Sequence, residues 1–382
     1  MRRLGVTLTP VLTSLLTSAV ASAVALTLAV PATAAPPAVT TGATSDARPG
    51  AKPGGPDPFR DGWAETVVDA DQNLRGLAAV SPREAWVTGE SLTDGGPARV
   101  FRTTDRGRTW TDVSPELTEG LSFRDVEVDG RVAHVLAIGP GEASRIYRST
   151  DGGASWTEAF RNTDEDAFYD CMAFYGGGKR GLAVSDPVDG KLRILSTADR
   201  GRSWSVLPSK GMPASDGEFG FAASGDCLVT AGRSAFLITG GKRSRVLRSD
   251  DRGLTWRATA SGIPAGESAG GFAGDFASPR HGIAVGGDFA DADDTEDTTA
   301  YTRDGRTWTV GADLTHVGED VSFLRGTRYA VATGDYGGSA GSSITSDGGA
   351  TWKRVSKLGY HAIECVGAVC WAAGSKGRVG RG

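Results

Sequence analysis

The chain has 382 residues, with 41 Lys and Arg against 46 Asp and Glu, and therefore a formal net charge of −5 at pH 7. Its length allows a sizeable buried core, and its mild acidity argues against nucleic acid as a partner. The four histidines are widely scattered and the four cysteines form no Cys-x-x-Cys pair, which excludes the usual spacing of a zinc site. We therefore expect no metal and no cofactor.

The first 34 residues have the features of a secretory signal peptide. They begin Met1-Arg2-Arg3, continue as an apolar run, and end in the small-residue sequence Pro31-Ala-Thr-Ala34. The alternative is a membrane anchor, which the small-residue ending disfavours. Residues 35–58, rich in Pro, Gly, Ala and Thr, are predicted to be a disordered linker. The mature chain is thus expected to be a secreted, extracellular monomer without a membrane span, free or held to the cell wall.

Six copies of one short motif divide the rest of the chain. The motif reads Ser/Thr-x-Asp-x-Gly-x-Ser/Thr-Trp, and its copies occupy residues 103–110, 149–156, 197–204, 249–256, 302–308 (one residue short) and 345–352. Steps of 43 to 53 residues between the motif aspartates indicate one four-stranded unit per repeat. The Asp carboxylate can accept backbone hydrogen bonds in a tight turn, Gly supplies a positive φ, and Trp buries a large ring. We assign this structural role to Asp105, Asp151, Asp199, Asp251, Asp304 and Asp347.

Short apolar runs separated by turn residues predict the four strands of each repeat. In the first two repeats these runs are residues 74–81, 85–89, 99–103, 110–113, 123–128, 132–138, 146–149 and 156–160. The last repeat contains three runs, 360–365, 370–374 and 377–381, so the N-terminal run 63–68 is expected to supply its fourth strand and close the ring. The sequence therefore predicts an all-β, seven-bladed β-propeller of four-stranded blades over residues 59–382, with little helix.

The four cysteines of an exported chain are expected to be oxidised. Cys365 and Cys370 flank a tight turn between two strands, which brings their β-carbons close enough for a bridge. Cys171 and Cys227 remain, on the first strands of neighbouring repeats. Other pairings stay open.

With its motif, its seven-fold count and its closing strand, the chain resembles the photosystem II stability/assembly factor-like propellers, whose motif is called the Asp-box or BNR repeat. The likeness covers residues 59–382 and rests on residues 149–156, 345–352 and 374–379. It implies a non-enzymatic propeller that binds a partner protein through arginines near the ring entrance, here Arg75 and Arg124. The same box occurs in sialidases, sortilin-type receptors and xyloglucan-degrading enzymes, so it specifies a fold rather than a function. Nothing in the sequence indicates photosynthesis.

The binding site is expected on the face opposite the motif turns, where propellers usually place their sites. The candidate residues lie at the starts of first strands and between second and third strands: Arg75, Arg124, Tyr169, Asp170, Asp186, Glu218, Asp288, Asp335, Tyr336 and His361. Taken singly, each is explained as a solvated loop residue. As a group they suggest a surface for an unidentified extracellular or envelope protein, or for a glycan.

The alternative function is an extracellular, glycan-active propeller of the sialidase or glycosidase type. Paired carboxylates such as Asp170 and Asp186 would suit a glycosidase, although their separation cannot be read from the sequence. The Arg-Ile-Pro signature of sialidases is absent, and seven blades differ from the six of that family. A carboxylate with a strongly raised pKa in a pocket between the third and fourth blades would favour catalysis, and a shallow charged mouth would favour binding.

Overall fold

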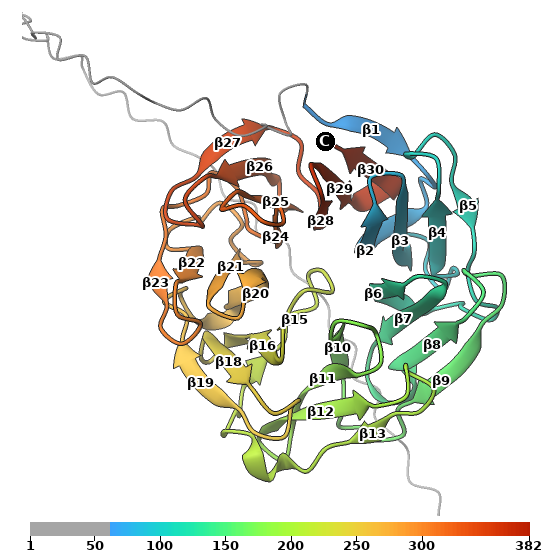
Figure 1. Cartoon of the computed structure of the whole chain (residues 1–382), viewed down its shortest axis with the longest axis horizontal. Coiled ribbons are helices and arrows are strands. Elements are labelled where there is room, and N and C mark those ends of the chain that lie inside the picture. Colours follow the sequence, from blue (N-terminus) through green and yellow to red (C-terminus); the bar gives the residue numbers. More distant parts are fainter. Residues whose placement is uncertain (1–61) are drawn as a thin grey trace, which may run out of the picture. The chain divides into compact units, whose positions relative to one another are not determined.

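The computed structural model describes residues 62–382, which form seven antiparallel sheets arranged in a ring (Figure 1). The chain is a seven-bladed β-propeller, as predicted. The proposed signal peptide and linker lie outside the described residues. Within residues 62–382 the helical elements are three single 3-10 turns, η1 (Gly141–Ala143), η2 (Ser209–Gly211) and η3 (Ser375–Gly377), and no helix there could cross a bilayer.

Blades 1 to 3 each contain four consecutive strands, the first of which lies nearest the centre of the ring in Figure 1. Blade 1 is β2 (Gln72–Ser81), β3 (Glu84–Ser91), β4 (Arg99–Thr103) and β5 (Thr111–Asp112). Blade 2 is β6 (Ser122–Asp129), β7 (Val132–Ile138), β8 (Arg145–Ser149) and β9 (Thr157–Arg161). Blade 3 is β10 (Tyr169–Phe174), β11 (Gly181–Val188), β12 (Lys191–Thr197) and β13 (Ser205–Val206).

Blades 4 to 7 repeat this order and complete the ring. Blade 4 is β15 (Leu228–Ala231), β16 (Ser234–Ile238), β18 (Arg245–Ser249) and β19 (Arg257–Ala260). Blade 5 is β20 (Gly266–Ser278), β21 (His281–Asp288), β22 (Thr299–Thr302) and β23 (Thr309–Val310). Blade 6 is β24 (Asp320–Phe323), β25 (Ala330–Tyr336), β26 (Ser339–Thr345) and β27 (Lys353–Ser356). Blade 7 is β28 (Ala362–Val366), β29 (Val369–Ala373), β30 (Arg378–Arg381) and β1 (Ala64–Val67).

The N-terminal strand closes the ring, as expected. β1 pairs antiparallel with β30, from Ala64 opposite Arg381 to Val67 opposite Arg378. Because β1 supplies the outer strand of the last blade, the two ends of the propeller are joined by backbone hydrogen bonds and β30 has no unpaired edge.

Blade 5 carries two extra strands, β14 (Glu218–Phe219) and β17 (Gly240–Gly241), on its inner edge. Glu218 was expected at the start of a first strand, but the first strand of blade 4 begins at Leu228. The physical reason is a buried ion pair, in which the Glu218 carboxylate binds Arg245 and also accepts the Thr239 hydroxyl. This pair holds Glu218 beside the β16–β18 connection and leaves the next residues free to enter the centre of the ring.

The repeated motif forms the same turn between the third and fourth strands of blades 1 to 6. In blade 1 the Asp105 carboxylate accepts the Thr109 N–H at 3.0 Å and the Thr109 hydroxyl at 2.7 Å. Equivalent bonds recur in the other five copies, including the shortened one at Asp304. The bonds from Thr109 lower the pKa of Asp105 to about 2. These aspartates therefore remain charged and accept the hydrogen bonds that stabilise the turn.

The hydrophobic core is divided into clusters that lie between neighbouring blades. Trp156 of the blade 2 motif packs edge-on against Trp86 of blade 1, with ring centroids 6.5 Å apart. Trp110 of the blade 1 motif meets Trp371 of blade 7 in the same way, at 6.1 Å. The motif tryptophan thus ties each blade to the preceding one, including across the closure.

Two disulfides cross-link the ring, one within a single hairpin and the other between two blades. Cys365–Cys370 crosses the β28–β29 hairpin, and Cys171–Cys227 joins β10 of blade 3 to the residue before β15 of blade 4. Both pairings fit the arrangement expected from the sequence. The second bridge links two blades close to the centre of the ring.

We expect loss of the inter-blade disulfide to destabilise the protein more than loss of the hairpin disulfide. The two bridges join cysteines 56 and 5 residues apart, and the entropy that a disulfide removes from the unfolded chain grows with loop length. The Cys171→Ala/Cys227→Ala variant should lose roughly 4 kcal/mol of unfolding free energy and Cys365→Ala/Cys370→Ala roughly 2 kcal/mol. Urea unfolding under oxidising conditions measures both, and the reverse order would refute the loop-length argument.

Candidate functional site

A cavity of about 350 Å³ opens on the face opposite the motif turns, and we call it the mouth cavity. Its walls come from the starts of first strands, the connections that precede them and the loops after second strands: Arg75, Arg124, Phe221, Ala222, Ala223, Phe272, Phe289, Val317, Glu319 and Tyr336. Residues from five different blades or their connections therefore meet here, as in many ligand sites of ring-shaped folds.

Residues 220–226, the crossing segment, form one wall of the mouth cavity. The segment leaves β14 and extends to blades 1 and 2, where Nη1 of Arg75 donates to the carbonyl of Ala223 at 2.8 Å. Nη1 of Arg124 donates to the carbonyl of Ala222 at 3.2 Å. The Gly220 N–H donates to Asp186 of blade 3 at 3.3 Å. The segment is therefore held from two sides of the ring.

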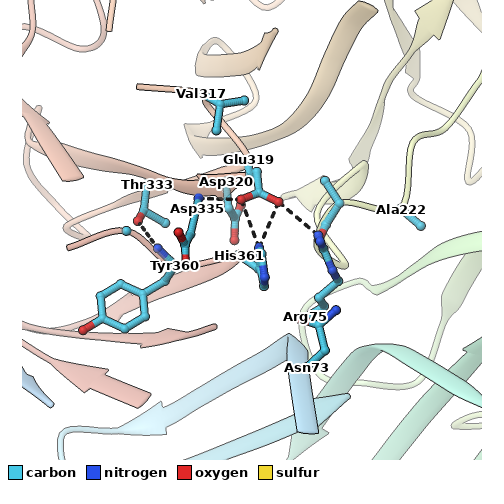
Figure 2. Close-up of polar contacts among 12 residues, drawn as sticks. Asn73, Arg75, Ala222, Val317, Glu319, Asp320, Thr333, Asp335, Tyr360 and His361 are labelled. Atoms are coloured by element: carbon cyan, nitrogen blue, oxygen red, sulfur yellow. Dashed lines mark hydrogen bonds and ion pairs between the residues drawn. The ribbon is translucent and has the colours of Figure 1, made fainter. Parts of the chain in front are cut away.

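A buried ionic network centred on Glu319 fixes Arg75 (Figure 2). Oε1 of Glu319 lies 3.0 Å from Nη1 of Arg75 and 3.0 Å from Nδ1 of His361, and Oε2 accepts the Asp335 N–H at 2.6 Å. Burial alone would raise the pKa of Glu319, but the charges and hydrogen bonds of His361 and Arg75 outweigh it and lower the pKa to about 2. The network joins blades 1, 6 and 7 through one ionised carboxylate.

Arg124 supplies the second cation of the mouth cavity. Its guanidinium binds Glu90 at 3.0 Å and the Ser122 hydroxyl at 3.0 Å. Burial lowers the pKa of Arg124 to about 10, so it stays charged at neutral pH. Beside it, Nε of Arg75 is buried and has no hydrogen-bond partner within the described residues. The cavity therefore offers positive charge that internal contacts only partly satisfy.

Aromatic rings form the other side of the mouth cavity. Phe221 packs edge-on against Phe272 and against Phe289, with ring centroids 5.5 Å apart in both pairs. Phe289 is 42 % exposed and Tyr336 is 37 % exposed. Exposed aromatic rings next to arginine are the side chains that most often dominate protein-binding sites.

The structure brings together five of the ten residues singled out by sequence. Arg75, Arg124 and Tyr336 line the mouth cavity, and His361 and Asp335 join it through Glu319. Asp335 also forms an ion pair with Arg378.

The other five candidates lie outside the mouth cavity. Tyr169 is buried between blades 2 and 3, with its ring edge-on to Phe160, and Glu218 is buried in its pair with Arg245. Asp288 accepts the Ala290 N–H at the end of β21. These contacts give the three residues structural roles.

Asp170 of β10 and Asp186 of β11 form a carboxyl pair in blade 3, in which Asp170 is buried and Asp186 is half-buried. Burial and the neighbouring Asp186 raise the pKa of Asp170 well above its usual range, and burial raises the pKa of Asp186 to about 6. Such a shift is what a glycosidase acid needs. However, Asp170 is 3 % exposed and neither residue lines the mouth cavity. Asp186 instead anchors the crossing segment by accepting the Gly220 N–H.

Sequence reasoning missed Glu319, Phe221, Phe272 and Phe289. Glu319 directly precedes Asp320 at the start of a first strand, so the same positional rule that selected the other candidates could have selected it. Nothing local in the sequence marks the phenylalanines as neighbours. Within residues 62–382, no group of three or more His, Cys, Asp or Glu is placed to hold a metal ion.

Comparison with known proteins supports the fold. No protein-family model and no curated protein matches the sequence. Among solved structures, YCF48 bound to D1 peptide is similar at a TM-score of 0.59 and 16 % identity, over 84 % of this chain and 94 % of that one. YCF48 from Cyanidioschyzon merolae gives 0.54 and 19 %, over 84 % and 98 %. A chain of the mitotic checkpoint complex gives 0.57 and 14 %, over 90 % and 98 %. The propeller architecture is shared.

Proposed function

We propose that the chain is a secreted, non-catalytic binding propeller that captures a segment of a partner protein in the mouth cavity. The observation that carries this proposal is the meeting of Arg75 and Arg124 with exposed aromatic rings in one concave site. The similarity to a YCF48 propeller solved with a peptide supports a protein partner. The signal-like N-terminus and the two disulfides support secretion.

The chemistry of the mouth cavity indicates what such a segment would present. Phe289 and Tyr336 offer apolar area to an aliphatic or aromatic side chain. Arg124 already binds a backbone carbonyl of the crossing segment, and a guanidinium binds a carbonyl or a carboxylate of a partner by the same geometry. An extended peptide with one large apolar side chain and a nearby acceptor group fits both features.

The test removes the exposed rings and leaves the buried network intact. Peptides are selected from a displayed random library on residues 35–382, and their affinity is measured for Phe289→Ser/Tyr336→Ser. We expect at least about a tenfold loss, since exposed aromatic anchors carry most of the energy of such sites. Phe289 and Tyr336 contribute little to the core, so the melting temperature should change little.

Leu117→Ser is the matched control. Leu117 is 83 % exposed in the connection between blades 1 and 2 and does not line the mouth cavity. Selected peptides should bind this variant as well as they bind the unchanged chain. Peptides that bind all three proteins equally would place the interaction elsewhere and reject the mouth cavity.

A further inference from the structure

Charge is strongly segregated between the two faces of the ring. We call the face made by the turns between first and second strands and by the motif turns the motif face. In blades 1 to 6 every turn between the first and second strands contains an exposed cation: Arg83, Arg131, Lys179, Arg233, Arg280 and Arg328. None of these six turns contains Asp or Glu. The motif turns add no net charge to this face, because their seven acids, the six motif aspartates among them, are balanced by seven arginines. An acidic protein therefore carries a basic face.

The opposite face is acidic. The connection between blades 2 and 3 contains Asp164, Glu165 and Asp166, and the β21–β22 loop contains five acids between Asp291 and Asp297. The net charge of −5 is thus the sum of two faces of opposite sign. Such a charge distribution orients a protein in an external field, whereas net charge alone does not.

Hydrogen bonds to the motif turns hold the basic turns in place. The Arg106 N–H donates to the Arg83 carbonyl at 2.9 Å, and the Arg200 N–H donates to the Lys179 carbonyl at 3.0 Å. The same bond joins Gly152 to Arg131 and Gly348 to Arg328. In these blades the cation therefore stands beside the motif turn, and repetition of the blade places the cations at a common level around the ring.

Three motif turns place arginine where glycine would be easier. Arg106, Arg200 and Arg252 have φ of 72°, 65° and 66°, whereas the equivalent position in two other motif turns is glycine. This left-handed conformation is strained for any residue with a Cβ. All three arginines are exposed, and their side chains form no hydrogen bond or ion pair within residues 62–382. These three strained positions therefore carry exposed positive charges that no internal group neutralises.

Arginines elsewhere in the ring are used differently. Arg124, Arg193, Arg245 and Arg378 all pair with carboxylates. The cations of the six turns between first and second strands, Arg180 and Arg325 included, form no ion pair with any described carboxylate. An external anion would therefore bind them without first breaking an internal salt bridge.

We propose that the motif face docks on a planar anionic lipid surface. The cations are distributed over six blades, so a plane meets them together, whereas a linear polyanion reaches only one sector of the ring at a time. The acidic opposite face would be repelled, which would leave the mouth cavity directed away from the lipid and open to a partner. Each basic residue near an anionic bilayer strengthens binding by about fivefold at moderate salt. This inference does not depend on what the mouth cavity binds.

The test is co-sedimentation of residues 35–382, which contain every strand of the closed ring, with lipid vesicles. We expect binding to vesicles of mixed phosphatidylcholine and phosphatidylglycerol, weakening as salt rises, and little binding to phosphatidylcholine alone. Arg233→Ser/Arg280→Ser/Arg328→Ser should weaken binding to the mixed vesicles by about a hundredfold, since each lost charge contributes about fivefold. None of these three side chains forms a hydrogen bond or ion pair within the described ring, so the fold should persist, as the melting temperature would show.

Lys242→Ser/Lys357→Ser/Lys376→Ser is the matched control, because it removes the same charge from connections on the acidic face. It should leave vesicle binding unchanged. Equal loss in both triple variants would reduce the effect to net charge and overturn the proposal. Absence of binding to anionic vesicles would also overturn it, and binding only to soluble polyphosphate would assign the face to a polymer instead.

Discussion

Replacing Arg75 with Ala is expected to lower the free energy of unfolding by about 3–5 kcal/mol. The Glu319 side chain is 3 % exposed and its nearest cation is Arg75, at 3.0 Å. Removal of the guanidinium leaves a buried carboxylate with His361 as its remaining side-chain partner. It also removes the hydrogen bond to the Ala223 carbonyl, which helps to hold the crossing segment. Urea unfolding of the variant and the unchanged chain measures the loss.

Two further variants separate this effect from the general loss of an arginine. Arg99→Ala removes an exposed pair with Asp112, at 3.2 Å, and should cost at most about 1 kcal/mol. Arg75→Met/Glu319→Gln removes both buried charges and should recover part of the stability, because no uncompensated ion remains. If Arg75→Ala costs no more than Arg99→Ala, the network does not contribute to stability as argued.

The fold was accessible from sequence because its signals are local. Each motif places Asp, Gly and Trp within eight residues, and the turn they form depends on contacts inside that stretch. The strands expected in blades 1, 2 and 7 lie within two residues of those observed, and β7 (Val132–Ile138) matches fully. Closure followed from counting strands, since the last repeat lacked one strand and the N-terminal run 63–68 supplied it.

The site was less accessible because its contacts are long-range. Arg75 was selected from its position at the start of a first strand, but its partners Glu319 and Ala223 lie 244 and 148 residues away in the chain. The sequence places Glu218 at the start of a first strand, and that position would put the crossing segment in blade 4. Its true path depends on the burial of that carboxylate with Arg245, which no local pattern signals. A propeller sequence therefore identifies the ring and its faces better than it identifies the contacts across its centre.

The segregation of charge is less predictable from the sequence than the fold and more predictable than the site. Net charge suggested only a mildly acidic protein. Once the strands are assigned, however, alternate connections belong to opposite faces, and residues such as Arg233 and Asp291 can be sorted by connection alone. The sequence therefore contains the charge of each face, and the topology is needed to assign each charged residue to its face.

Stability is expected to fall as the pH rises from about 5 to about 8. Asp125 of blade 2 is 5 % exposed and accepts the Met172 N–H of blade 3 at 2.6 Å. Burial, reinforced by the neighbouring Glu364, raises the pKa of Asp125 to about 8, and burial raises the pKa of Glu364 to about 7. Asp125 and Glu364 both line a cavity of about 100 Å³ along the centre of the ring, and burial raises the pKa of Asp226 in the same cavity, so all three acids act in the same direction and Asp125 is the one chosen for substitution.

The sign follows from proton binding. Between about pH 4 and the folded-state pKa, Asp125 is ionised in the unfolded chain and protonated in the folded one, so the folded state binds more protons and loses stability as pH rises, by up to about 1.4 kcal/mol per pH unit. Glu319, whose pKa is lowered to about 2, acts in the opposite direction and loses its contribution only as pH falls below about 4. The two effects together place the stability maximum near pH 5.

Asp125→Asn tests this origin of the pH dependence. The Asn carbonyl can still accept the Met172 N–H, and the side chain is neutral at every pH, so the slope between pH 5 and pH 8 should become shallower by about 1 kcal/mol per pH unit. At pH 8 the variant should then be at least as stable as the unchanged chain. Glu116→Gln, which neutralises an exposed acid between blades 1 and 2, should leave the slope unaltered. If urea unfolding gives parallel pH profiles for all three proteins, Asp125 is not the group that links folding to proton binding.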